Sequence, residues 1–468
     1  MSAELSARHV AATGVPGDDY VRKGRRREFR RDALTVLSWA FIAASLALFL
    51  ADGGASQFNT LGGGVVALGT ISGLVATAFV AFMTILIARV PIIDATIGQD
   101  RATILHATLG KGVVYGLVAH ALFLLVGYSI SGKVDLVSAF ASLWEGGGLD
   151  FIWAWVGLAL FIGIGVTSLL AFRRRNPYEL WYAIHLTTYL AVLASLPHQF
   201  SMSGLLAPGT KSRALWLAMW VLAAFCVLAF RVFLPLYTSL EHRLRVKRVV
   251  PAGQDAVSIE LVGKGVERLG ATGGNWFNWR FWTPELALQP HPFSLSAEPT
   301  EDGLRLTVRN LGNGSARIQR LRPGTAVSIE GPYGLFTDAA RTRDRVVLAG
   351  AGIGIAPVRA LLEATSVEPG KAAVILRATT PKQLYLADEI TAICTARGVP
   401  VITLVGSRAG QRWVPTSHAG HRLTDFVPWV AEADVYVCGP DAWMDAFAED
   451  ARICGVAPAQ LHRESFDW

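Results

Sequence analysis

The sequence predicts a multidomain chain in which a bundle of six transmembrane helices is followed by a β-rich module and an α/β module. Of its 468 residues, 52% are hydrophobic and only 17% are charged, and the long apolar runs are concentrated in the first half. After about Leu240, alternating strand patterns and then an alternation of strands and helices replace these runs. We therefore expect one membrane-embedded half and one water-soluble half.

Six apolar and nearly uncharged runs are long enough, or nearly so, to cross a hydrocarbon core about 30 Å thick. They are residues 33–51, 62–88, 103–131, 151–172, 180–198 and 214–230. Basic residues gather before the first run and after the second, fourth and sixth, which places both termini in the cytoplasm.

Residues 1–32 are expected to form a basic cytoplasmic tail. Its first 21 residues have no periodic apolar pattern and are expected to be disordered. The alternative for the arginine run 25–31 is a cleaved export signal. We favour a first transmembrane helix, because the apolar run that follows is longer than a signal core and five more runs come after it.

Two of the apolar runs contain pairs of histidines, His106 with His120 and His185 with His198. The step from His106 to His120 spans about 21 Å of helix and leaves both rings on about the same face. In an ideal helix the step from His185 to His198 would rotate the second ring by about 140°, so we expect Pro197 to rewind this helix. Matched pairs of neutral imidazoles indicate axial ligands of two haems. The alternative is that they are polar residues bonded to neighbouring helices.

The β-rich module is predicted from strands such as 256–262 and 304–309. It contains two segments rich in glycine and proline, one from 274–277 to 291–296 and one at 331–334. Taken alone, these segments are typical of strand ends and turns.

The α/β module opens with residues 346–357, a buried-strand pattern followed by a glycine-rich turn into a helix. Exposed amides in such a turn can hold a pyrophosphate. The dinucleotide fingerprint is incomplete, because Ile355 occupies its last glycine position. A later strand, 434–437, leads into Cys438, which places a thiol at the carboxyl edge of the sheet, where ligands of α/β folds bind.

These motifs, in this order and after six spans, resemble those of the ferric reductase and NADPH oxidase superfamily of transmembrane flavocytochromes b. The motifs are His291-Pro292-Phe293-Ser294, Gly331-Pro332-Tyr333-Gly334, the turn from Gly350 to Pro357, and Cys438-Gly439-Pro440. The resemblance covers about residues 33–468, and the histidine spacings match the family's two haem-ligating helices. It implies a transmembrane haem domain at 33–236, an antiparallel β-barrel FAD-binding domain at 243–340 and a doubly wound NAD(P)-binding α/β domain at 341–468.

The resemblance also assigns residues to each cofactor. It implies two b-type haems, an inner one held by His106 with His185 and an outer one held by His120 with His198. The flavin and its phosphates would be held by two segments that contain His291, Pro292, Phe293, Ser294 and Ser296, and Gly314 and Ser315. NAD(P)H would lie against Gly350, Gly352, Gly354, Pro357, Gly439 and Pro440, with Cys438 near the nicotinamide. The terminal aromatic that stacks on the flavin would be Phe466 or Trp468.

Charge indicates the preferred dinucleotide. Arg377, Ser407 and Arg408 follow the ends of two predicted strands, where they suit the 2′-phosphate of NADPH. We expect NADPH rather than NADH. The alternative is that these arginines only solvate a surface.

The function implied by the resemblance is electron transfer across the plasma membrane, from cytoplasmic NADPH through FAD and the haems to an outside acceptor. Ferric chelates are the expected acceptor, and oxygen, reduced to superoxide, is the alternative. A different class is a membrane-anchored flavin reductase that feeds a quinone or a partner protein. The lipid bilayer is the expected environment, no nucleic acid is expected to bind, and the number of subunits stays open.

Overall fold

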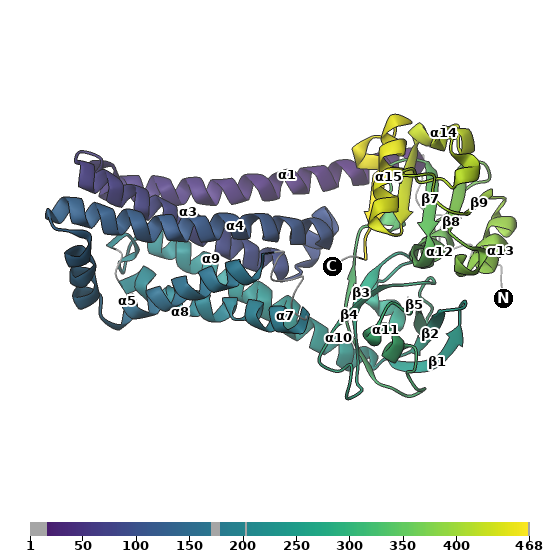
Figure 1. The fold of residues 1–468 in the computed structure, drawn as a ribbon, viewed down its shortest axis with the longest axis horizontal. Coiled ribbons are helices and arrows are strands. Elements are labelled where there is room, and N and C mark those ends of the chain that lie inside the picture. The colour runs from purple at the N-terminus through teal and green to yellow at the C-terminus, as the bar shows by residue number, and fades with distance from the viewer. Residues whose placement is uncertain (1–15, 170–177, 202–203, 467–468) are drawn as a thin grey trace. The chain divides into compact units, whose positions relative to one another are not determined.

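The computed structural model describes residues 16–169, 178–201 and 204–466, which divide into two compact units (Figure 1). We call residues 31–93 and 100–231 the helical unit. The sheet unit consists of the residues before position 31, the segment Asp94–Gln99 and the chain from Val232 onward.

The helical unit confirms the predicted transmembrane bundle. Within the described ranges, six helical segments are long and apolar enough to cross a membrane: Arg22–Gln57, Leu61–Ile87, Pro91–Gly132, Leu136–Thr167, Leu180–Ser201 and Lys211–His242. The helices that build them are α1 (Pro16–Phe49), α2 (Ala55–Gln57), α3 (Leu61–Ile87), α4 (Pro91–Gly132), α5 (Leu136–Thr167), α7 (Tyr178–Leu186), α8 (Thr188–Ser201), α9 (Lys211–Val227) and α10 (Leu234–His242). Each of the six segments contains or overlaps a predicted run.

Several helices begin earlier than the predicted apolar runs, among them α1 and α5. α1 begins at Pro16, so residues 16–21, which we expected to be disordered, are helical, and the basic run continues in the same helix. A proline suits this first position because the amide there has no partner inside the helix. α5 begins after Asp135, whose carboxylate caps it by accepting hydrogen bonds from the amides of Val137 and Ser138. Gly148, with φ of 55°, then interrupts α5 before the predicted run begins.

Small residues bring α3 and α4 close together. A Cβ atom added to Gly69, Gly116 or Gly127 would lie 3.0 Å or less from an atom of the facing helix. Glycine at these positions therefore lets the two backbones approach, as is common between helices in membranes. This packing presents carbonyl groups of α3 to the side chains of α4.

The first part of the sheet unit consists of two three-stranded antiparallel sheets. Their strand orders are β1-β2-β5 and β4-β3-β6, with β1 (Arg245–Pro251), β2 (Ala256–Val262), β3 (Trp276–Phe281), β4 (His291–Ser294), β5 (Gly303–Arg309) and β6 (Val327–Tyr333). Two single bridges, Arg245 with Ala326 and Leu295 with Leu306, connect the sheet edges. The sheets thus enclose a shared core as a barrel would, although two seams are held by single bridges. A short helix, α11 (Asn313–Ile318), follows β5.

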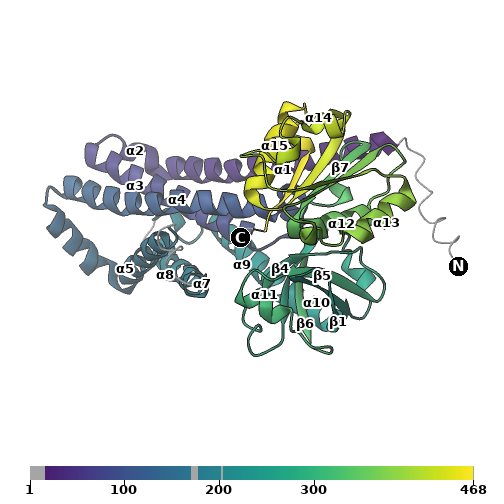
Figure 2. The same ribbon diagram turned by 45° about the vertical axis from the view of Figure 1, so that its right-hand side comes forward.

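The second part of the sheet unit is a doubly wound α/β fold, as predicted. Five parallel strands lie in the order β11-β10-β7-β8-β9, with β7 (Arg345–Ala351), β8 (Ala372–Ala378), β9 (Val401–Val405), β10 (Ala433–Cys438) and β11 (Leu461–Glu464). α12 (Ile355–Ala364) and α13 (Ala387–Arg397) pack on one face of this sheet, and α14 (Leu423–Phe426) and α15 (Asp441–Ile453) pack on the other (Figure 2). Val347 and Ala349 therefore contact a different helix layer from Val346 and Leu348, which explains why the strands are apolar throughout.

The segment Asp94–Gln99 belongs to the sheet unit although it lies between two predicted spans. Gly98, with φ of 77°, separates it from the rest of α4. The carboxylate of Asp94 accepts a hydrogen bond from the amide of Gly334 at 3.2 Å. Gly334 directly follows β6, so the 331–334 segment, which we expected to be a strand end or a turn, is mostly the end of a strand.

Candidate functional site

The helical unit places the partners of each predicted histidine pair on different helices. His106 and His120 lie on α4, while His185 and His198 lie on α7 and α8. The ring centroids of His106 and His185 are 5.9 Å apart, with their planes inclined by 65°. Two metal–nitrogen bonds of about 2 Å, placed end to end between two imidazole rings, need a similar separation.

The ring nitrogens nearer the backbone are held by α3. His120 Nδ1 donates a hydrogen bond to the carbonyl of Gly69 at 2.8 Å, and His106 Nδ1 lies 3.4 Å from the carbonyl of Met83. A carbonyl only accepts, so it favours the tautomer that carries the proton on Nδ1 and leaves Nε2 as the acceptor. Histidines that ligate metals are commonly oriented in this way. Gly73 also leaves room for the ring, because a Cβ there would lie 2.5 Å from His120 Nδ1.

The histidines fit axial ligands better than a conventional metal site. His198 Nδ1 is buried and has no hydrogen-bond partner in the described part of the chain. Within that part, no three side chains of His, Cys, Asp or Glu converge on one point. A haem held by two histidines requires no such cluster, because the porphyrin supplies the other four ligands.

The helical run that carries His185 and His198 is interrupted at Thr187, between α7 and α8. The Thr187 amide donates to the carbonyl of Ile184, three residues back. The hydroxyl of Thr188 also donates to the carbonyl of His185 at 2.5 Å. Pro197, which we expected to rewind the helix, lies inside α8. Threonine hydroxyls that bond to nearby carbonyls can thus replace proline as the cause of the break.

The predicted flavin segment forms β4, paired with β3. Phe293 stacks on His291 with ring centroids 6.5 Å apart, and the Phe293 carbonyl accepts from Trp279 Nε1 at 2.9 Å. His291 Nε2 is buried and has no hydrogen-bond partner among the described residues. Burial lowers the pKa of His291, and the charge of Arg280 lowers it further. His291 would therefore meet a flavin phosphate as a neutral donor.

The second predicted flavin segment lies beside the first. A Cβ on Gly314 would lie 3.9 Å from the ring of His291. Ser315 stabilises the start of α11, since its hydroxyl accepts from the Leu311 amide at 2.8 Å and donates to the Gly312 carbonyl at 3.0 Å. The structure thus brings both segments together, with Ser315 acting on the local turn.

Three side chains meet at the carboxyl edge of the parallel sheet. Ser294, from the flavin segment, donates to a carboxylate oxygen of Glu464 at 3.3 Å, and both residues are buried. Glu464 lies beside Cys438 in the register of β10 and β11, and Cys438 lies beside Gly350 of β7. The sequence analysis nominated Ser294 and Cys438 but not Glu464. Glu464 ends β11 (Leu461–Glu464), a strand that the sequence analysis did not predict, so the sequence offered no signal for this position.

The glycine-rich turn has the predicted form of strand, tight turn and helix. Gly352 has φ of 55°, and α12 begins at Ile355. A Cβ on Gly354 would lie 2.3 Å from the carbonyl oxygen of Cys438, so only glycine fits there. Pro357 lies in the first turn of α12, where backbone amides have no intrahelical partner.

The neighbouring Cys438-Gly439-Pro440 motif connects β10 to α15. A Cβ on Gly439 would lie 2.8 Å from the Cβ of Ala351, and Pro440 immediately precedes α15. The two predicted dinucleotide motifs therefore lie side by side.

Arg377 does not have the role that the sequence suggested. It is 3% exposed, and its guanidinium donates to the carbonyls of Gly406, at 2.6 Å, and of Ala378, its nearest contact. Burial lowers its pKa, and the charge of Arg408 adds to this effect. Arg377 therefore stabilises strand ends from inside the fold, rather than presenting a cation to a 2′-phosphate.

The other two residues of this prediction lie nearer the surface. Ser407 is exposed. Arg408 is half-buried and donates to the carbonyls of Arg412, Gln411 and Ala442 at 3.0 to 3.1 Å. Phe466, one candidate for the terminal aromatic, is 37% exposed, and Trp468 lies outside the described residues.

Comparison with known proteins assigns a relationship to each half. A family model described as "Ferric reductase like transmembrane component" matches residues 72–196, which include His106, His120 and His185 but end two residues before His198. The flavohemoprotein of Bordetella pertussis is 29% identical over 210 residues, which are 41% of this chain and 52% of the relative. The ferredoxin–NADP reductase B of Sorangium cellulosum is 30% identical over 215 residues, which are 42% of this chain and 84% of the reductase.

Among solved structures, the chain is similar to the flavohem-like FAD/NAD-binding domain of a nitric oxide dioxygenase from Vibrio cholerae O1 biovar El Tor. It is 21% identical, with a TM-score of 0.41, and the match covers 48% of this chain and 99% of that domain. The chain spans about half the length of the flavohemoproteins that it matches. By its apolar helices and its family model, it is a multi-pass membrane protein. The reductase part of the chain therefore belongs to the ferredoxin–NADP reductase family, and it is joined to a transmembrane part that is similar to ferric reductases.

Proposed function

We propose that this chain is a transmembrane oxidoreductase that passes electrons from cytoplasmic NADPH, through FAD and two b-type haems, to ferric chelates outside the cell. The paired histidines carry this proposal. His106 and His185 face each other across a gap that suits one metal ion, and α3 carbonyls orient His106 and His120. When bound, FAD would convert a hydride into single electrons and the haems would transfer them.

In this proposal, Ser294 and Glu464 orient the reacting part of the bound cofactors. The hydroxyl proton of Ser294 is directed to Glu464, which leaves the lone pairs of Ser294 Oγ to accept a hydrogen bond from a ligand. Cys438 places a small thiol beside this pair. These groups exclude water and fix orientation, so they need not supply acid or base chemistry.

NADPH is the proposed donor because the loop after β9 is basic. Arg408 and Arg412 place two guanidinium groups in this loop, and both groups donate to carbonyls. Ser407 is exposed beside them. With Arg377 buried, the discrimination between NADPH and NADH rests on this loop.

The plasma membrane, with both termini in the cytoplasm, is the proposed location, because the basic residues predict it. The lipid bilayer is the proposed environment, and the acceptor is the only partner that the proposal requires.

The first test is a visible spectrum of the purified protein, recorded without oxygen before and after NADPH is added, together with a count of haem per chain. We expect two b-type haems that become reduced. A protein that reduces its flavin but contains no haem would overturn the electron path and leave a membrane-anchored flavin reductase. Ferric citrate and oxygen are then compared as acceptors of the reduced protein, and faster oxidation by oxygen, with superoxide as product, would replace ferric chelates by the oxidase alternative.

A further inference from the structure

We propose that Arg305 is a positioning residue for the flavin segment and that Glu389, from the α/β part of the sheet unit, holds Arg305 in place. The proposal rests on the proposed function in one respect, since it takes residues 291–296 as the segment that binds FAD. It adds a connection between this segment and α13.

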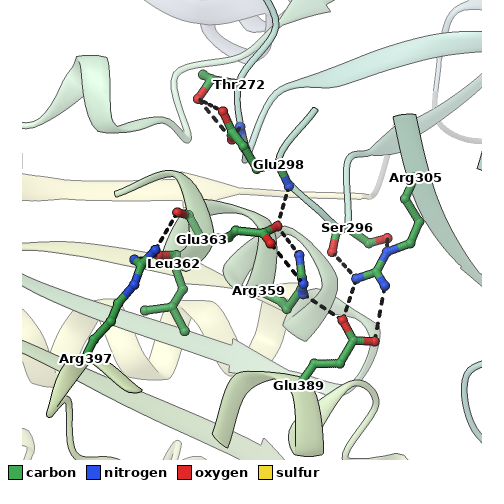
Figure 3. Close-up of polar contacts among 10 residues, drawn as sticks. Thr272, Ser296, Glu298, Arg305, Arg359, Leu362, Glu363, Glu389 and Arg397 are labelled. Carbon is green, nitrogen blue, oxygen red and sulfur yellow. Dashed lines mark hydrogen bonds and ion pairs between the residues drawn. The ribbon is translucent and has the colours of Figure 1, made fainter. Parts of the chain in front are cut away.

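Arg305 contacts one residue of the flavin segment through two different atoms. Its Nε donates to the hydroxyl of Ser296 at 3.2 Å, and a terminal nitrogen donates to the Ser296 carbonyl at 2.7 Å (Figure 3). The side chain is only 18% exposed, and Ser296 is fully buried. The planar guanidinium therefore fixes both the backbone and the side chain of Ser296.

The same guanidinium is held from the other side by Glu389, in the first turn of α13. Its two terminal nitrogens lie 2.8 and 3.2 Å from the two carboxylate oxygens, a bidentate pair. Arg359 of α12 adds a second cation, with its Nε 2.9 Å from the carboxylate. Burial alone would raise the pKa of Glu389, but Arg305 and Arg359 outweigh it and lower the pKa, so the carboxylate stays ionised.

A second contact joins the α/β part to the same stretch of chain. The amide of Glu298, two residues after Ser296, donates to the carboxylate of Glu363 of α12 at 2.7 Å. Glu363 also accepts a hydrogen bond from Arg359. Arg359 therefore connects the two carboxylates, and α12 and α13 together hold the chain at Ser296 and at Glu298 (Figure 3).

These contacts imply that the flavin segment and the α/β part move together. Ser294, also in the flavin segment, is itself hydrogen-bonded to Glu464 of β11. A movement of α13 relative to β5 would displace Arg305, and Ser296 with it. By linkage, FAD binding and dinucleotide binding should then affect each other by the same factor.

The test measures the dissociation constant of FAD for the full-length protein in detergent, with and without saturating NADP⁺, by flavin fluorescence and visible circular dichroism. We expect NADP⁺ to tighten FAD binding in the wild-type protein. Glu389→Gln should weaken FAD binding about five- to tenfold, because a charge-assisted pair is lost from a partly exposed site. It should also bring the effect of NADP⁺ close to a factor of one.

Arg305→Gln should have the same effects as Glu389→Gln, and the double variant should add little, because both changes break one connection. The effects of Arg305→Lys should lie between those of wild type and Arg305→Gln, since an ammonium group keeps the charge but cannot contact both partners as a guanidinium fork does. It also serves as the milder variant if Arg305→Gln does not fold.

The matched control is Glu449→Gln, which removes the pair between Arg452 and Glu449. This pair is also 2.8 Å long but lies entirely within α15. We expect FAD binding in the control to be unchanged. If Glu389→Gln keeps both the FAD affinity and the effect of NADP⁺ within twofold of wild type, the pair only stabilises the fold and the proposal is overturned. If the wild-type protein binds no FAD, the proposed function fails first.

Discussion

Side-chain nitrogen atoms in the helical unit and in the sheet unit differ in their hydrogen-bond partners. In the helical unit, His106 and His120 each have one ring nitrogen directed to a backbone carbonyl, and the other ring nitrogen is left to accept. In the sheet unit, the buried guanidinium groups of Arg341 and Arg377 are surrounded by protein carbonyls. A buried side chain suited to ligand binding has a polar atom without a hydrogen-bond partner inside the protein, whereas the polar atoms of a buried structural side chain have their partners there.

This difference separates residues that looked equivalent in the sequence. Both the histidines and Arg377 were predicted to bind cofactors from their type and position. The histidines fit that role, and Arg377 fits a structural one. His291 is an exception in the sheet unit, because its Nε2 is buried without a hydrogen-bond partner among the described residues.

The largest effect is expected from His120→Ala. If His120 holds a haem, the haem content of the purified protein should fall from two per chain to one, because alanine cannot ligate iron. Haem is counted from the pyridine haemochrome spectrum. His421→Ala, at an exposed position of the sheet unit, is the control and should keep both haems. Two haems retained in His120→Ala would remove this histidine from the ligand set.

Gly73→Ala tests the same pair without changing a ligand. The added methyl group would lie 2.5 Å from His120 Nδ1, so the ring or the helix must shift. We expect partial loss of haem and an altered haem spectrum, with FAD content unchanged. Gly163→Ala in α5, where a Cβ meets nothing within 4 Å, should be silent. Identical spectra for the two variants would show that His120 needs no such close fit.

Arg377→Gln tests the structural half of the comparison. It leaves several buried carbonyls without a donor, which should cost about 1–3 kcal/mol of stability and lower the melting temperature of the protein. The ratio of kcat/KM for NADPH to that for NADH should stay within twofold. Arg408→Gln should instead lower that ratio, with little change in melting temperature. If Arg377→Gln lowered the ratio of kcat/KM for NADPH to that for NADH and left the melting temperature unchanged, Arg377 would have its predicted role in binding NADPH.

The smallest effect is expected in the pH dependence of stability that comes from His291. Because burial lowers its pKa in the folded protein below the ordinary value of 6.5, the unfolded chain binds the proton first as the pH falls. The stability that depends on neutral His291 is complete above pH 6.5 and is lost as the pH falls from 6.5 through the folded-state pKa.

Melting temperatures between pH 5 and 7.5 measure this loss. His291→Asn should flatten the acid side of the profile relative to wild type. Parallel profiles for the two proteins would mean that His291 is not the titrating group.

Much of the architecture could be read from local patterns. Apolar runs predicted all six helical segments, because a helix in lipid must be apolar along most of its length. Alternation predicted β2 and β5, and the glycine-rich turn predicted the passage from β7 to α12. The first residues of the helices were harder to predict, since they depend on capping residues such as Asp135, which a search for apolar runs does not detect.

The candidate site divides in the same way. The sequence by itself determined that four histidines lie in two apolar runs and that a thiol ends a parallel strand, because spacing and periodicity are local properties of the chain. Only the tertiary structure decided that Glu464 meets Ser294, that Arg377 is enclosed, and that Arg305 joins Ser296 to Glu389. The reason is physical: these partners are mostly tens of residues apart or more, so packing determines whether a charged side chain faces a ligand or a carbonyl.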